Sequence, residues 1–410
     1  MTRTVLVSLN YAPEKVGIGP FSAGLAEGLA AAGHSVEVIA GHAYYPQWKR
    51  YEQFVGKGWC SSVENGVRVL RCPHYVPAKP TGAKRLIHLT SFGLAIFGPV
   101  LSRVLRPRAE RPELVICVAP ALFSVPGAWL LACLTGAKLW IHIQDFEVEA
   151  AFATGLFKGG AIGWFARGLE RLLLRLADRI SSISPQMCAK LREKGVAADQ
   201  IVELRNWANA PGVDPDKGQS YREKWGLEGK RVVLYSGTIA NKQGIEIIGV
   251  VAQMLQDDPE IVFVVCSEGP NRQALEEATR HLSNVHFYGL QPAENLSQLL
   301  ALASVHIMPQ ISGAADLVLP SKLANMLASG RPVVATADEG TALYDEVQGC
   351  GLSVSPGDAE GVVAAIRRIL SDPELDAAFR AEALNRARLR WSYKGVLDTL
   401  EREVAMLKNS

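Results

Sequence analysis

The segment that follows the apolar run 137–143 carries the side chains best suited to acid–base chemistry. It contains His142, Asp145 and Glu147. Because open α/β sheets bind ligands at the carboxyl ends of their strands, these groups would lie at a ligand-binding edge. A carboxylate there can orient or deprotonate a hydroxyl group, so Asp145 and Glu147 are the candidate catalytic residues, with His142 in support. The alternative is structural: a cap for the next helix and a satisfied core histidine.

Another polar segment has the features of a phosphate-binding helix start. Pro320 and Ser321 are residue types that begin helices, and Lys322 adds a cation in the first turn. The free N–H groups and the dipole of such a helix attract anions, so we expect a pyrophosphate there. Asn325 follows one turn later and Asp316 precedes the helix, and both join the candidate site. The alternative is an ordinary capped surface helix.

Two further segments could add phosphate contacts. Ser236 and Gly237 follow an apolar run and expose backbone and hydroxyl donors, and Lys242 supplies a point charge suited to phosphate. Arg205 could add a second cation from the first half of the chain.

A short glycine turn, Gly17 and Gly19, lies between the first apolar run and a helical pattern. Glycines let the backbone approach a ligand closely, and the following helix start attracts anions or sugar hydroxyls. The complete dinucleotide-binding glycine pattern is missing, and no acidic residue follows the second apolar run, so this half is not expected to bind a dinucleotide. A plain strand–helix turn is the alternative.

The elements that must position these residues alternate between short apolar runs and helical patterns. Such alternation predicts parallel sheets covered by helices on both faces. The series occurs twice, which predicts an α/β chain of two Rossmann-like domains facing a central cleft. We expect an N-terminal domain over 1–205, a linker over 206–228, a C-terminal domain over 229–390, and a helix of about 391–408 that packs back on the first domain.

Composition narrows the class of protein. The 410 residues are 48% hydrophobic and 20% charged, which is typical of globular proteins. Residues 1–205 hold 24 Lys and Arg against 15 Asp and Glu, a net of +9, and the remainder holds 19 against 26, a net of −7. A basic first half suggests an anionic partner, although chance scatter is the alternative, and nothing points to nucleic acid. The seven scattered cysteines predict reduced, buried thiols in a cytoplasmic protein.

The segment 79–111 differs from the rest of the first half. An apolar stretch from Leu86 to Leu105 is flanked on both sides by Lys and Arg and interrupted by His88 and Pro99. Its length could span a bilayer, but the interruptions favour a helix, over 84–106, that lies on an anionic membrane surface. The alternative is an ordinary helix that covers the sheet.

Together these segments resemble the retaining GT-B glycosyltransferases of family 4. The resemblance covers nearly the whole chain and rests on the early glycine turn with GLAEGLAAAGHSVEV, and on SGTIANKQG, SEGPNRQAL, HFYGLQPAENLSQLLALASVHIMP and PSKLANMLASGRPVVAT. The sequence of the last block, PSKLANMLASGRPVVAT, is similar to that of the colanic-acid-type branch, the exopolysaccharide fucosyltransferases. Two glutamates of the family are absent, because Leu317 and Asn325 occupy their positions and Asp316 is the candidate substitute for the first.

The resemblance implies that the N-terminal domain binds the acceptor and that the C-terminal domain binds the nucleotide sugar, and it also implies roles for particular residues. Lys242 would hold the donor pyrophosphate, and Glu268 and Gly269 would line the donor site. The turn at Leu290 would hold the base through backbone groups, and Gly17 and Gly19 would contact the donor from the other domain.

The expected function is transfer of a hexose or deoxyhexose, fucose being one candidate, from a nucleoside-diphosphate sugar to a lipid-pyrophosphate-linked saccharide in exopolysaccharide synthesis. A GDP-sugar is favoured over a UDP-sugar, retention is the family expectation, and inversion with Asp145 or Glu147 as base is the alternative. No metal or cofactor is expected, because lysines and a helix start supply the positive charge. The expected location is cytoplasmic, peripheral on the inner membrane face. The competing functions are a sugar-nucleotide epimerase and a non-catalytic binding protein.

Overall fold

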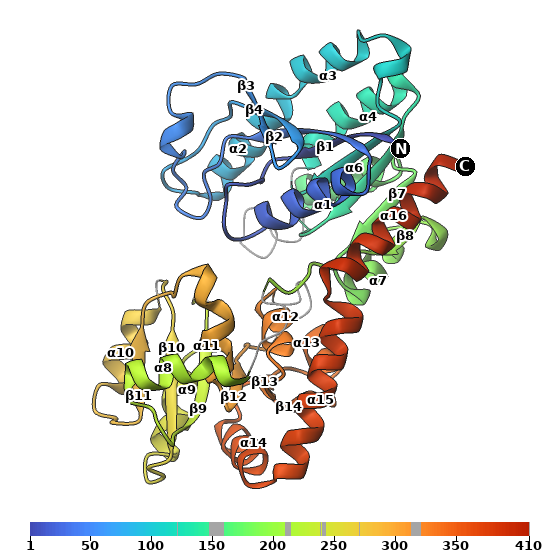
Figure 1. Ribbon diagram of the computed structural model, residues 1–410. Coiled ribbons are helices and arrows are strands. Elements are labelled where there is room, and N and C mark those ends of the chain that lie inside the picture. Colours follow the sequence, from blue (N-terminus) through green and yellow to red (C-terminus); the bar gives the residue numbers. More distant parts are fainter. Residues whose placement is uncertain are drawn as a thin grey trace. The chain divides into compact units, whose positions relative to one another are not determined.

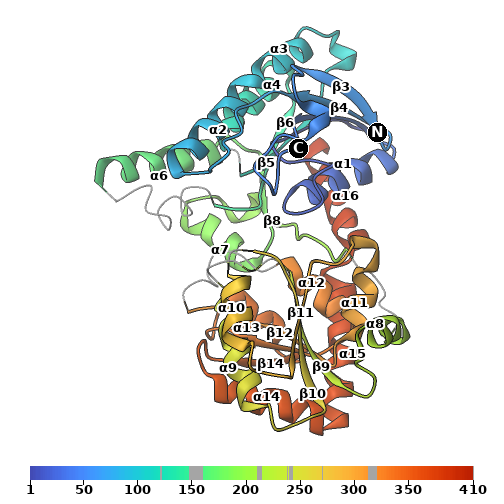
Figure 2. The ribbon, with the colours of Figure 1, turned by 90° about the vertical axis from the view of Figure 1, so that its left-hand side faces the viewer.

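The structure is a computed structural model that describes residues 1–120, 122–146, 160–209, 215–237, 239, 243–269, 271–312 and 321–409. The chain folds into two compact units. The first unit comprises Met1–Arg205 together with Leu397–Ser410, and the second comprises Asn206–Val396. Each unit has its own sheet and its own hydrophobic core (Figures 1 and 2).

The first unit is built on a sheet with the strand order β3-β4-β2-β1-β5-β6-β7-β8. Every neighbouring pair is parallel except β3 and β4. The strands are rich in Val and Ile, and every residue of β5 is buried, as expected for a parallel sheet covered on both faces. The strand bounds are β1 Arg3–Ser8, β2 Ser35–Gly41, β3 Cys60–Glu64, β4 Val67–Cys72, β5 Leu114–Ala119, β6 Lys138–Ile143, β7 Arg179–Ser182 and β8 Ile201–Glu203.

Helices cover this sheet on both faces. The chain moves from β1 to β2 in one direction along the sheet and from β5 to β6 in the other. Right-handed crossovers therefore place α1 and α4 on opposite faces. The helices are α1 Gly19–Ala31, α2 Gly82–Ala95, α3 Phe97–Val104, α4 Val125–Thr135, α6 Gly160–Leu174 and α7 Pro185–Glu193, with 3-10 turns at Glu52–Phe54, Arg108–Glu110, Leu122–Ser124 and Ala198–Gln200.

The expected single helix over 84–106 is two helices, α2 and α3, which meet at Ile96. The break has a local cause. Pro99 has no N–H group to donate to the carbonyl of Ala95, so the regular pattern of helix hydrogen bonds cannot continue through it.

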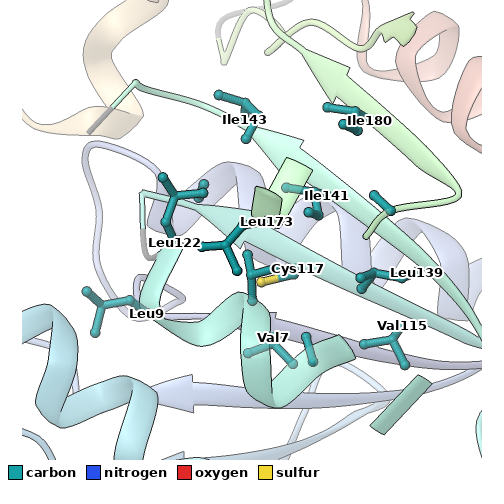
Figure 3. Packing of buried hydrophobic residues seen from close by; sticks show 14 of the residues in the cluster. Val7, Leu9, Val115, Cys117, Leu122, Leu139, Ile141, Ile143, Leu173 and Ile180 are labelled. Atoms are coloured by element: carbon teal, nitrogen blue, oxygen red, sulfur yellow. The ribbon is translucent and has the colours of Figure 1, made fainter. Parts of the chain in front are cut away.

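The core on one face of the first sheet consists of alternate strand residues. Val7 of β1 and Leu9, the residue after its end, lie two positions apart in this core, and Val115 and Cys117 lie two positions apart on β5 (Figure 3). Alternation is the consequence of the two-residue period of a strand. Cys117 is fully buried, and all seven cysteines are free. The labelled residues that complete this core layer are Leu122, Leu139, Ile141, Ile143, Leu173 and Ile180.

The second unit has an all-parallel sheet with the order β11-β10-β9-β12-β13-β14. Its strands are β9 Arg231–Ser236, β10 Ile261–Cys266, β11 Val285–Tyr288, β12 Val305–Met308, β13 Val333–Thr336 and β14 Gly351–Val354. Its helices are α8 Gln219–Trp225, α9 Ile247–Met254, α10 Arg272–Thr279, α11 Leu296–Leu302, α12 Ser321–Ala328, α13 Ala342–Val347, α14 Ala359–Ser371 and α15 Pro373–Arg390, with 3-10 turns at Pro215–Gly218 and Ala293–Asn295.

A linker was expected over 206–228, and this expectation is wrong from residue 215 onward. Residues from 215 onward form a 3-10 turn and helix α8, and these pack on α11 within the second unit. Tyr221 is buried there, and the ring of Trp225 stacks on Tyr288 with 3.7 Å between ring centroids. Apolar burial against the sheet overrides the Pro, Gly and Asp content that had favoured an open linker.

The chain ends in helix α16, Tyr393–Asn409, whose residues from Leu397 onward belong to the first unit. Two contacts hold it there. Glu403 pairs with Arg179 at 3.4 Å, and the Lys408 ammonium donates to the carbonyl of Met1 at 3.3 Å. The first unit is therefore assembled from two segments that are far apart in the sequence (Figure 1).

Candidate functional site

The candidate residues lie where the strands of each sheet end. In the first unit the strand order reverses at β1, between β2 and β5. In the second unit it reverses at β9, between β10 and β12. Open parallel sheets bind ligands at the carboxyl edge beside such a reversal, because the loops on its two sides leave in opposite directions. We therefore describe the loops after these strands in each unit.

The glycine turn after β1 is close-packed, which explains its residue types. Gly17 has a φ of 72°, and a Cβ atom added to it would lie 3.0 Å from the ring of Tyr45. A Cβ atom on Gly19 would lie 2.8 Å from the Cβ of Glu14. Only glycine fits at these positions, and Gly19 is the first residue of α1.

Glu14 is a buried carboxylate that holds this turn, and the sequence analysis missed it. It is 2% exposed. It accepts hydrogen bonds from the Asn10 amide at 2.9 Å and from the backbone N–H groups of Tyr44 and Tyr45 at 2.9 and 3.0 Å. Burial raises the pKa of Glu14, and these hydrogen bonds oppose that rise. In the sequence, only its position three residues before Gly17 could have indicated that Glu14 holds the glycine turn.

His142 lies inside the sheet and does not reach a surface. It is 1% exposed. Its Nδ1 is 2.8 Å from the hydroxyl of Ser181, and its Nε2 is 2.9 Å from the amide nitrogen of Gln144. The Trp140 indole also donates to Ser181, at 2.8 Å. The amide nitrogen can only donate, so Nε2 accepts and Nδ1 carries the proton.

This network favours the structural alternative for His142, a satisfied core histidine, over a supporting role in the chemistry. Burial lowers its pKa to about 4, so the ring is neutral, and both ring nitrogens are already hydrogen-bonded. His142 therefore orients Gln144 and the end of β6. Asp145 follows directly and is half-buried, whereas Glu147 lies outside the described residues.

In the second unit, Lys322 is the cation best placed for an anionic ligand. It lies in the first turn of α12. Its ammonium group donates to the hydroxyl of Tyr235 at 2.8 Å and lies 4.4 Å from the centre of that ring. The Tyr235 hydroxyl in turn donates to Gln243 Oε1 at 2.7 Å. Burial lowers the pKa of Lys322 to about 8, so the group is near its titration point at neutral pH.

Lys322 and Gly237 are brought together although they are far apart in the sequence. Gly237 follows β9 with a φ of 128°, and a Cβ atom on it would lie 3.3 Å from the Lys322 ammonium. Gly269 follows β10 with a φ of 131°, and a Cβ atom there would lie 2.4 Å from the carbonyl oxygen of Ile239. The two loops and the helix start thus surround one backbone-lined corner. Tyr235, which sequence reasoning missed, anchors it.

The other predicted donor-site residues occupy varied positions. Ser236 is half-buried, Glu268 is exposed and Leu290 is 44% exposed. Asn325 accepts a hydrogen bond from the backbone N–H of Asn209 at 2.7 Å. Its amide oxygen therefore stabilises the segment that enters the second unit.

Arg205 was expected to offer a cation, but its guanidinium forms an ion pair with Glu203. It belongs to the first unit and is 8% exposed. The pairing offsets its charge, so a phosphate-binding role is not favoured by its surroundings.

Lys242, Asp316 and Pro320 lie outside the described residues, and Ser321 is described by its backbone alone, as the first residue of α12. No cluster of three or more His, Cys, Asp and Glu side chains arranged to hold a metal ion occurs in the part of the chain that the structure describes.

Two family models match consecutive parts of this chain. A glycosyl transferase 4-like domain matches residues 16–207, and a domain of the glycosyl transferases group 1 matches residues 218–386. The chain is also 38% identical, over 93% of its length and 95% of the relative's, to a putative colanic acid biosynthesis glycosyl transferase, WcaI, of Escherichia coli K12. The chain belongs to the family 4 glycosyltransferases. This chain is therefore a glycosyltransferase, and its family membership disfavours the epimerase and the non-catalytic alternatives.

Solved structures agree with this family and its GT-B fold. The transferase superimposes on a sucrose-phosphate synthase from Thermosynechococcus elongatus with a TM-score of 0.73, covering 99% of both chains at 18% identity. It superimposes on Anabaena HepE in complex with UDP and glucose with a TM-score of 0.67, covering 98% of this chain and all of that one at 14% identity. At these identities the likeness establishes the fold alone.

Proposed function

We propose that this glycosyltransferase moves a sugar from a nucleoside-diphosphate sugar to a lipid-linked saccharide precursor in exopolysaccharide synthesis. The observation that carries the proposal is the corner formed by Lys322, Tyr235 and Gly237 in the unit that matches the group 1 domain. The exopolysaccharide context comes from the relative whose name places it in colanic acid biosynthesis.

The donor pyrophosphate would bind at the start of α12. Free N–H groups of the first turn and the Lys322 ammonium supply positive charge to the phosphates. As the bond to the sugar breaks, negative charge grows on the pyrophosphate, and a fixed cation stabilises that charge without a metal. Tyr235 holds the ammonium in place before the donor arrives. A GDP-sugar is the first donor to test and a UDP-sugar the second.

Asp145 would position the acceptor hydroxyl at the end of β6. With retention, the departing pyrophosphate takes up the proton of the attacking hydroxyl on the same face of the sugar. With inversion, Asp145 would instead act as the base on the opposite face. The anomeric configuration of the product, determined by NMR, distinguishes the two routes.

The membrane-bound part of the proposal rests on α2 and α3. Together they form the stretch Gly82–Val104, whose length and apolar composition would allow it to cross a bilayer. In its most apolar part, 39% is buried inside the protein. Leu86, Ile87, Leu94 and Leu101 are exposed on it. Exposed apolar side chains beside Lys84 and Arg85 favour a helix pair that lies on an anionic membrane surface. Flotation with anionic liposomes tests this: protein that stays at the bottom at low salt contradicts it.

A screen of nucleotide sugars by thermal shift tests the donor. A ligand that binds the folded protein raises the melting temperature by mass action, so the correct donor stands out from its analogues. If neither GDP nor UDP shifts the melting temperature at millimolar concentration, the proposed donor site is wrong.

A further inference from the structure

The first unit contains a cavity that none of the residues discussed so far lines. Its volume is about 410 Å³, which is large enough for a sugar-sized ligand. It lies beside the segments that follow β2 and β4. Its lining residues are Trp48, Lys49, Arg50, Val55, His74, Tyr75, Val76 and Ala78.

The charged side chains that line this cavity are all positive. Lys49 and Arg50 line it, and no acidic residue belongs to its lining. Arg85 on α2 lies nearby, with its guanidinium 5.3 Å from the centre of the Trp48 ring. Arg50 donates from Nη2 to the carbonyl of His74 at 2.7 Å, which fixes the guanidinium at the cavity wall. Cations fixed in this way attract an anionic ligand such as a phosphate.

His74 adds a buried hydrogen-bonding group that has no partner among the described residues. It is 5% exposed, and its Nδ1 lies 3.4 Å from the carbonyl of Cys72, which can only accept. Its Nε2 is therefore a lone acceptor, and no described group donates to it. Burial and the neighbouring His88 lower the pKa of His74 to about 3, which keeps the ring neutral. Because this nitrogen has almost no exposed surface, a ligand in the cavity does not reach it, and His74 contributes to the cavity wall as a neutral ring.

Trp48 supplies an apolar ring next to these polar groups. Its φ of 53° is rare for a bulky residue, and such backbone is held in place mainly at functional sites. The ring packs against His88 and Tyr44, with centroids 5.3 Å away in both cases. An aromatic ring beside a positively charged wall matches a sugar ring that carries a negatively charged group.

We propose that this cavity binds a saccharide phosphate, with the phosphate on Lys49 and Arg50 and the sugar against Trp48. The inference rests on the proposed function, because it assigns the acceptor's headgroup to these residues. Two sources share this chemistry: a lipid-pyrophosphate-linked sugar, whose chain would extend over the exposed Leu86 and Ile87 of α2, and a free sugar phosphate.

The test is calorimetric titration of the full chain with four probes: glucose, inorganic phosphate, glucose 1-phosphate and geranyl-pyrophosphate-linked glucose. We expect the two probes that carry both sugar and phosphate to bind at least tenfold more tightly than glucose or phosphate alone. Tighter binding of the geranyl probe assigns the lipid-linked source, and equal binding assigns the free sugar phosphate.

Substitutions of the cavity residues test whether glucose 1-phosphate binds in this cavity. Arg50→Gln and Trp48→Ala should each weaken glucose 1-phosphate about tenfold, which corresponds to the loss of one charge-assisted hydrogen bond or one stacked ring. Lys49→Gln should weaken it severalfold, and because Lys49 is exposed this variant keeps the fold. Lys57→Gln is the matched control, an exposed lysine outside the cavity lining.

Titrations with GDP and UDP separate this inference from the proposed function. Unchanged nucleotide affinity in the cavity variants, together with weakened glucose 1-phosphate, supports the cavity assignment. If glucose 1-phosphate binds no better than phosphate, if no probe binds, or if Lys49→Gln and Arg50→Gln keep full affinity, the cavity assignment is overturned while nucleotide binding still supports the transferase. Failure of both nucleotides to bind is instead a failure of the proposed donor site.

Discussion

The two units of this transferase have the same kind of parallel sheet but place different chemistry at its carboxyl edge. In the first unit, two histidines behind these loops, His142 and His74, are buried and neutral. In the second, an ammonium group, Lys322, is partly buried against a tyrosine. The halves of the chain have opposite net charges, yet the lysine that we propose to hold the donor phosphates lies in the acidic half. In this proposal, local packing rather than overall charge decides where the donor binds.

The largest expected effect concerns the second unit. Lys322→Ala should weaken nucleotide binding about 100-fold, since a charge-assisted contact to phosphate contributes about 1.5–3 kcal/mol. Calorimetry with GDP and UDP measures it. Lys230→Ala, which removes an exposed lysine of the same unit, is the control and should leave the affinity unchanged. Equal affinities in the two variants would mean that the second unit does not bind through Lys322.

The corresponding test in the first unit is Glu14→Ala. This change leaves the N–H groups of Tyr44 and Tyr45 without their acceptor, and a buried unsatisfied donor costs about 1–3 kcal/mol. We expect a loss of about 2 kcal/mol in the free energy of unfolding, measured with denaturant. Glu27→Ala, at a partly exposed carboxylate on α1 that accepts one hydrogen bond from the Asn65 amide, should change stability by much less. A stable Glu14→Ala protein would show that the glycine turn does not depend on this carboxylate.

Acid should destabilise the first unit through its buried histidines. The pKa of His142 is lowered from 6.5 to about 4 in the folded state, so its contribution to stability is complete above pH 6.5 and is lost as the pH falls toward 4. Between pH 6.5 and 5 the loss is about 2 kcal/mol for this residue, at 1.36 kcal/mol per pKa unit.

Denaturant unfolding at pH 7 and pH 5 measures this loss. His142→Asn should show a smaller difference between the two pH values than the parent protein. His306, buried in the second unit with a pKa of about 3, provides the comparison, because His306→Asn should reduce the pH dependence in that unit. A parent protein that is equally stable at both pH values would contradict the buried neutral state.

The smallest effect is the pH dependence of nucleotide binding. The pKa of Lys322 is lowered from 10.5 to about 8, so the ammonium is charged below pH 8 and loses its proton above it. A bound phosphate favours the charged form, and affinity should therefore fall as the pH rises, by about tenfold between pH 7 and pH 9. Lys322→Arg keeps its charge over this range and should show a flat profile. The same slope in both proteins would assign the titration to another group.

Much of the fold could be predicted from the sequence, because apolar strand runs and helical periodicity are local signals. The two series of apolar runs form the strands of two sheets, as expected, whereas β3, an exposed and polar antiparallel strand, was missed because it lacks an apolar run. The helix over 84–106 and the linker were wrong where one proline or apolar packing overrode the local pattern. For the site, the sequence identified Lys322, Gly237 and the glycine turn but not Tyr235 or Glu14.

What the sequence determined by itself is the order of elements, the family and the residue types at the loops, since these depend on spacing along the chain. What only the tertiary structure decided is which of those residues share a neighbourhood and in which charge state. Lys322 meets Tyr235 across 87 positions, and Glu14 meets Tyr44 across 30. Burial then makes the His142 ring neutral and lowers the pKa of Lys322. These properties follow from desolvation and contact in three dimensions, and no local pattern in the sequence encodes them.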